Sequence, residues 1–178
     1  MQKEKLLLHV CCATCSLHPY FLLKKDYNIS FYFYNPNIHP REEYIKRLEG
    51  IKFVAGKYNI PLIIGNYQKD KWFDICSHFK EEPEGGKRCN LCYKMRIDKT
   101  AQTAEEKNFK LFSTTLSVSP HKDANAINKI GKSAAEDKNL SFYQANFKKK
   151  DGFKRTVQIS KQLNLYRQNY CGCIYSKK

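Results

Sequence analysis

Short apolar segments alternate with amphipathic ones along the chain. Five apolar runs have the length and composition of buried β-strands, at residues 5–10, 29–34, 61–64, 110–114 and 140–144. Between the second and third runs, apolar side chains recur at spacings of four and three, as on one face of a helix: Tyr44, Leu48, Ile51, Ala55 and Tyr58. Pro40 suits the start of this helix. Ile127, Ile130 and Ala134 predict another helix before the fifth strand.

This alternation predicts an α/β fold: a mostly parallel, Rossmann-like sheet of about five strands with helices on both faces. No repeat, low-complexity tract or linker interrupts the sequence, so we expect residues 1–178 to form a single domain. In such sheets, ligands bind beyond the carboxyl ends of the strands. Cys11, Cys12 and Cys15 follow the first strand, and polar loops at 35–40 and 117–123 follow the second and fourth. We therefore expect a metal site at this edge.

Cysteines carry the most distinctive chemistry. Seven of the eight fall into three tight sets, and only Cys76 stands alone. A chain of 178 residues does not need disulfides to stabilise a small core. The N-terminal apolar run is too short for a signal peptide or a membrane span. We therefore expect a cytoplasmic protein with no membrane partner, whose clustered thiols bind metal or take part in redox chemistry.

Cys89 and Cys92 are predicted to open a helix that runs to about Thr103, with both sulfurs on one face. With Cys11 and Cys12 they provide four ligands. Adjacent cysteines are unusual as zinc ligands, so the Cys11-Cys12 pair favours an iron–sulfur centre. Zinc would more naturally use Cys12 and Cys15 together with Cys89 and Cys92.

The remaining candidates are less specific. Cys171 and Cys173, separated by one residue, can form a strained and readily reduced disulfide, can be further metal ligands, or can belong to an inert tail. Cys76 is expected to be a buried small apolar side chain. His9 and His39 lie near the expected site, and a structural role is favoured for both.

The formal net charge of +15 indicates a polyanionic partner, of which nucleic acid is the commonest. A generally lysine-rich proteome is the alternative. Twelve Tyr and eleven Phe could stack unpaired bases, although many alternate within the expected strands and are core residues. There is no phosphate-binding glycine loop and no dinucleotide fingerprint. Charge alone does not choose between RNA and DNA.

Six segments together resemble one known family, the cobalamin-independent epoxyqueuosine reductases of the QueH family. They are HVCCATC (9–15), YNPNIHP (34–40), EPEGGKRCNLC (82–92), TTLSVSP (114–120), KKDGF (149–153) and LYRQNYCGC (165–173). The resemblance covers nearly the whole chain. Thr14 departs from it, because proline is expected there, and this affects the stiffness of the loop rather than the ligands.

The resemblance implies reduction of epoxyqueuosine to queuosine at the wobble position of tRNA, the last step of queuosine biosynthesis. It also implies an adenine nucleotide alpha-hydrolase-like fold, a [4Fe-4S] cluster held by Cys11, Cys12, Cys89 and Cys92, and a second, mononuclear iron nearby. Cys171 and Cys173 would be a redox-active pair, and the partners would be the tRNA anticodon stem-loop and a separate electron donor.

Two other functions are considered. A zinc-stabilised RNA-binding module without catalysis is the main alternative. A tRNA thiolation enzyme of the same fold should carry a Ser-Gly-Gly-x-Asp-Ser loop after the first strand, where this chain has cysteines instead.

Overall fold

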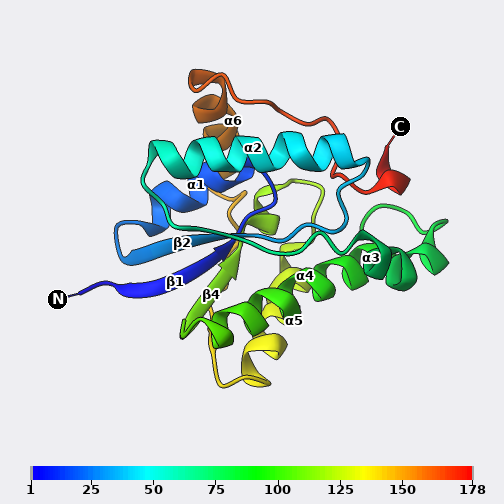
Figure 1. Cartoon of the computed structure of the whole chain (residues 1–178), viewed down its shortest axis with the longest axis horizontal. Helices are drawn as coiled ribbons and strands as arrows, with labels where there is room; N and C mark the ends of the chain where they lie inside the picture. The colour runs from blue at the N-terminus through cyan, green and yellow to red at the C-terminus, as the bar shows by residue number, and fades with distance from the viewer. Residues whose placement is uncertain (1, 178) are drawn as a thin grey trace.

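The computed structural model describes residues 2–177 and contains one five-stranded sheet in which every strand pairing is parallel (Figure 1). The strands are β1 (Glu4–His9), β2 (Tyr27–Phe33), β3 (Leu62–Ile64), β4 (Leu111–Thr114) and β5 (Ser141–Phe142). They are ordered β3-β2-β1-β4-β5. The predicted α/β class and all five predicted strands are confirmed.

Six α-helices cover the two faces of the sheet. On one face lie α1 (Ala13–Leu23), α2 (Arg41–Lys57) and α6 (Gly152–Gln162); on the other lie α3 (Lys69–Cys76), α4 (Lys87–Glu106) and α5 (Ala124–Glu136), as Figure 1 shows. Short 3-10 turns, η1 (Ser77–Phe79), η2 (Thr115–Val118) and η3 (Ile174–Ser176), complete the fold. The expected helices α2, α4 and α5 are confirmed. Within the described chain, no helix is both long and apolar enough to cross a membrane.

Alternate side chains of the central strands belong to two separate cores. Leu6, Leu8 and Phe31 pack with α1 and α2, whereas Leu7 and Tyr32 pack with α4 and α5. All five are at most 1 % exposed. A strand buried on both faces needs apolar residues at every position, which explains the continuous runs in the sequence.

The strand order produces a switch point beside β1. From β1 the chain moves outward through β2 to β3, and β4 then returns to the opposite side of β1. The carboxyl ends of β1 and β4 therefore open into one crevice, where ligands bind in sheets of this kind. Thr115, directly after β4, donates a hydrogen bond to the sulfur of Cys11, directly after β1, at 3.8 Å.

Candidate metal centre

Three thiols meet at the end of β1. The sulfurs of Cys11, Cys12 and Cys15 all lie within 4.8 Å of one another. Helix α1 begins at Ala13, and its N-cap is Cys12, whose sulfur accepts a hydrogen bond from the Cys15 amide at 3.3 Å. The exposed amides of a helix N-terminus favour negative charge. The start of α1 therefore favours negative charge among these three sulfurs.

The three sulfurs share this charge unequally. Hydrogen bonds from the Cys12 and Cys15 thiols hold the pKa of Cys11 well below its usual range. The same bonds raise the pKa of Cys12 to about 12 and also raise the pKa of Cys15. The Gln168 side-chain amide lies 2.9 Å from the Cys12 sulfur. One anionic sulfur supported by neighbouring donors suits a metal ligand set.

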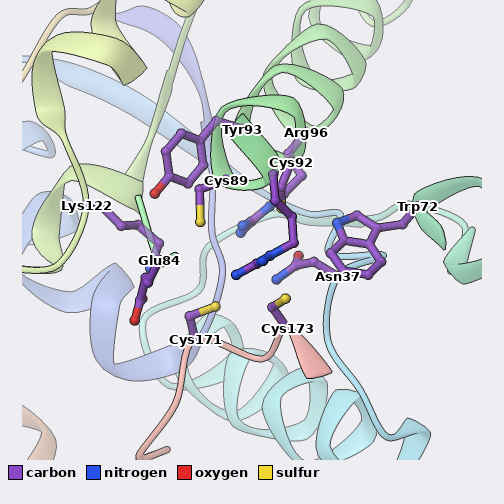
Figure 2. Close-up of a pocket in the computed structure, with 11 residues that line it drawn as sticks. Asn37, Trp72, Glu84, Cys89, Cys92, Tyr93, Arg96, Lys122, Cys171 and Cys173 are labelled. Atoms are coloured by element: carbon purple, nitrogen blue, oxygen red, sulfur yellow. The ribbon is translucent and has the colours of Figure 1, made fainter. Parts of the chain in front are cut away.

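A second set of thiols lies at the start of α4. Cys89 and Cys92 occupy its first turns, and the Gly85 amide donates to the Cys89 sulfur at 3.2 Å. They line a narrow cavity together with Cys171 and Cys173, and Figure 2 shows the sulfurs of Cys89, Cys171 and Cys173 turned into the space between α4 and the C-terminal segment. These four thiols do not belong to the close triad of Cys11, Cys12 and Cys15.

A larger cavity of about 520 Å³ adjoins the triad and is lined by Cys11, Cys15 and Cys171. Arg96 and Lys122 line both this cavity and the narrow one. Although burial lowers the pKa of Lys122, the neighbouring thiols of Cys171, Cys11 and Cys15 raise it above its ordinary value. Two cations thus sit between the thiol sets, where they offset the charge of an anionic centre.

Three buried donor atoms at the narrow cavity have no hydrogen-bond acceptor within residues 2–177: Trp72 Nε1, Arg88 Nε and Arg96 Nε. Trp72 is fully buried, and both arginines are 2 % exposed. An unsatisfied buried donor costs about 1–3 kcal/mol, so such donors normally have an acceptor. Sulfur-rich, anionic groups such as an iron–sulfur cluster accept hydrogen bonds of this kind. The donor set and the thiols therefore fit a thiolate-held metal group.

The C-terminal pair is positioned by a buried arginine on α2. Arg47, 2 % exposed, donates through Nη1 to the Cys171 carbonyl at 2.9 Å and through Nη2 to the Tyr170 carbonyl at 3.1 Å. Its Nε donates to Glu43 at 2.7 Å, and the other Glu43 oxygen accepts from the Tyr166 hydroxyl at 2.7 Å. We call Arg47, Glu43 and Tyr166 the α2 clamp.

The histidines and the remaining residues singled out from the sequence are packed in the protein interior. His9 is fully buried between Thr114 Oγ1 and the Tyr34 carbonyl, and burial lowers its pKa to about 3, so it is a neutral core side chain. His39 is 5 % exposed and packs against the rings of Trp72 and Phe73. Cys76 is fully buried, as expected. Thr14 is buried within α1, where its hydroxyl lies 3.0 Å from Ser160 of α6.

Sequence reasoning missed the charged side chains of the site. Arg96 lies four residues after Cys92 on α4, so the helical period alone could have placed it on the same face as that thiol. Lys122 belonged to the loop expected at this edge but was not singled out. Nothing in the sequence marks Arg47, because it belongs to an amphipathic helix rich in exposed charges.

Comparison with known proteins identifies the family. The family model described as epoxyqueuosine reductase QueH matches residues 6–178. A protein of this name from Histophilus somni is 43 % identical over 176 residues, covering 97 % of this chain and 72 % of that protein. Another from Thermotoga maritima is 39 % identical over 173 residues, covering 96 % and 88 %.

A more distant likeness concerns the fold alone. The U34-tRNA thiolase NcsA from Methanococcus maripaludis, solved with its [4Fe-4S] cluster, superposes with a TM-score of 0.62 at 16 % identity. All of this chain is covered but only 63 % of that one. The family match and the identities over nearly the whole chain agree with the cysteine motifs and the sheet: the chain belongs to the epoxyqueuosine reductase QueH family.

Proposed function

We propose that this protein reduces epoxyqueuosine to queuosine at the wobble position of tRNA, with a [4Fe-4S] cluster and a redox-active dithiol, in the cytoplasm. One observation carries the proposal beyond family membership. Cys11 and Cys15, from the triad after β1, and Cys171, from the C-terminal pair, line the same cavity of about 520 Å³. A substrate in that cavity contacts both a metal ligand set and a dithiol.

We assign the cluster to Cys11, Cys12, Cys89 and Cys92. They stand at the N-termini of α1 and α4, where helix dipoles favour anionic ligands. Cys15 remains outside this set although it lies within 4.8 Å of Cys11 and Cys12, so it is available to a second, mononuclear iron. When bound, such a centre supplies single electrons and a Lewis acid that polarises the epoxide C–O bond.

The dithiol balances the reaction. Removing the epoxide oxygen as water consumes two electrons and two protons, and oxidation of Cys171 and Cys173 to a disulfide releases the same number. A hydrogen bond from Cys173 holds the pKa of Cys171 well below its usual range and raises that of Cys173. All eight cysteines are free in this structure. A separate electron donor then restores the thiols after each turnover.

The positive charge serves substrate binding. Lysines precede α6 at 148–150 and lie on it at 154 and 161, and Phe153 of the same helix lines the cavity. Each phosphate neutralised by such a side chain releases condensed counterions, so affinity for an anticodon stem-loop should fall steeply with salt. An affinity that stays flat between low and physiological salt would contradict binding through phosphates.

The decisive experiment combines metal analysis with product analysis. Anaerobically purified protein should contain iron and sulfide, and it should convert epoxyqueuosine to queuosine in tRNA when supplied with a chemical reductant. Digested tRNA is analysed by mass spectrometry. A colourless, zinc-loaded protein that binds the stem-loop without converting it would instead support a zinc-stabilised RNA-binding module.

A further inference from the structure

The segment before α6 has a strained backbone. Lys150 and Asp151 both have positive φ, 51° and 61°, which is costly for residues other than glycine. At Gly152, an added Cβ would lie 1.8 Å from the Phe147 carbonyl oxygen and 2.9 Å from the His18 ring. Only glycine fits there. Such strain persists where the surrounding structure enforces it, often at binding sites.

The strained turn presents Phe153 at the cavity. This side chain is 39 % exposed, and it lines the same 520 Å³ cavity as Cys11 and Cys15. The turn is also tied to another part of the cavity lining, because the Lys148 ammonium donates to the Lys122 carbonyl at 2.6 Å. An exposed phenyl ring in a concave site is an apolar surface without an internal partner.

The other Phe or Tyr side chain in the cavity lining is already engaged. The guanidinium of Arg47 lies 5.3 Å from the Tyr170 ring centroid, and the Tyr170 hydroxyl donates to the His39 carbonyl. Phe153, in contrast, pairs with no other aromatic ring among the described residues. Its face is therefore available to a planar ligand.

We propose that Phe153 is the stacking platform for the wobble base of the tRNA, which leaves the anticodon loop and enters the thiol cavity. Anticodon bases are unpaired, and aromatic side chains bind splayed bases of this kind by stacking. A cavity of about 520 Å³ is within the usual size range for ligand sites. The inference rests on the proposed function, since that function supplies the base as substrate.

The test measures affinity rather than turnover. Two anticodon stem-loops are compared, one carrying epoxyqueuosine and one abasic at the wobble position. Phe153→Ala should weaken binding of the base-bearing RNA by about 5- to 100-fold, the usual range for a lost base–aromatic stack, and leave the abasic RNA unchanged. Phe153→Tyr should retain the discrimination between the two RNAs. Phe53→Ala is the matched control, because Phe53 is 52 % exposed on α2, away from the cavity lining.

Equal weakening of both RNAs by Phe153→Ala, or no weakening of either, would overturn the stacking role. Thermal melting followed by circular dichroism shows whether the variant is folded. Product analysis of the wild-type protein runs in parallel. If the wild-type protein distinguishes the two RNAs but does not convert epoxyqueuosine to queuosine, the proposed reduction is refuted and the stacking is not. If the wild-type protein converts epoxyqueuosine and Phe153→Ala still binds the base-bearing RNA more tightly than the abasic RNA, the stacking role is refuted and the proposed reduction is not.

Discussion

The two thiol regions of this molecule are held in place in different ways. Cys11, Cys12 and Cys15 follow β1, which is paired with β2 on one side and β4 on the other. Cys171 and Cys173 lie in a segment after α6 that belongs to no strand or α-helix. Backbone ladders and two cores position the first set. Side-chain hydrogen bonds from the α2 clamp, together with the His39 amide donating to the Gly172 carbonyl at 2.8 Å, position the second.

This difference predicts separate stabilities. Segments outside helices and strand ladders open locally at a lower free energy than the whole domain. Although Cys173 and Tyr175 pack with the core on the α4 face, residues 163–173 form no strand or α-helix, so we expect the C-terminal segment to open before the β1 rim. This difference is consistent with the proposed roles, a redox-active dithiol in the C-terminal segment and fixed metal ligands after β1.

The largest effect is expected from loss of a proposed cluster ligand. Cys12→Ser or Cys92→Ser should lower iron and sulfide content sharply and abolish epoxyqueuosine reduction, because each removes a proposed ligand. Metal and sulfide analysis of anaerobic preparations measures this. Cys76→Ala is the control, since Cys76 is buried but outside both thiol sets, and it should keep its iron. Full metal content in both serine variants would disprove the ligand assignment.

Loss of the C-terminal pair should separate redox function from cluster assembly. In the Cys171→Ser, Cys173→Ser double variant, the visible spectrum of the cluster should remain near that of the wild type while multiple turnover is lost. Product analysis of digested tRNA measures the turnover. Wild-type activity would remove the redox role, and loss of the cluster would instead make these cysteines ligands.

The thiols after β1 could be placed from the sequence, whereas the surroundings of the C-terminal pair could not. The continuous apolar runs and the cysteines that follow the first run were enough for the sheet and for its functional edge, because both depend on local pattern and on a general rule for parallel sheets. Helices α1, α3 and α6 escaped prediction. Helix α1 carries Pro19 and cysteines and has no clear apolar period. In α6 the buried positions are Gly152, Thr156 and Ser160, which are small or polar residues that an apolar pattern does not mark.

The α2 clamp escaped prediction for another reason. Arg47 and Cys171 are 124 residues apart in sequence, and their contact depends on how the C-terminal segment folds back over α2. Surface and buried arginines look alike in a sequence. Contacts of side chains with distant carbonyls therefore require the tertiary structure.

Arg47→Lys tests the clamp directly. Lysine keeps the charge beside Glu43 but cannot reach both carbonyls as a planar fork. Hydrogen bonds to charged groups contribute about 1.5–3 kcal/mol each, so losing one should lower turnover by about 10- to 100-fold through misplacement of the dithiol. Iron content should stay unchanged. Arg41→Lys, at an exposed position of the same helix, is the matched control and should behave as the wild type.

Labelling of thiols gives a readout that loss of global stability would not reproduce. In folded Arg47→Lys protein, Cys171 should react faster with an alkylating reagent, whereas the cysteines after β1 should keep their wild-type rates. Uniformly faster labelling of all cysteines would show general destabilisation and would argue against a clamp specific to the C-terminal segment.

The smallest effect is expected from a single methyl group inside the C-terminal segment. Gly172 has φ 107°, and an added Cβ would lie 2.9 Å from Ile38 Cγ1 and 3.1 Å from Arg47 Nη1. Gly172→Ala therefore strains the backbone and presses on the clamp, at a cost of about 1 kcal/mol or more. A cost of about 1 kcal/mol shifts the equilibrium between placed and displaced dithiol about fivefold, so turnover should fall by at most about fivefold.

Gly56→Ala provides the matched control within α2. An added Cβ there meets no atom within 4 Å, and alanine in a helix is favoured over glycine, so unfolding should require about 0.5 kcal/mol more free energy. Chemical denaturation measures the stability, and product analysis measures the turnover. If Gly172→Ala lowered the metal content as well as the turnover, the C-terminal segment would be part of the metal site, and the two thiol regions would not be separable.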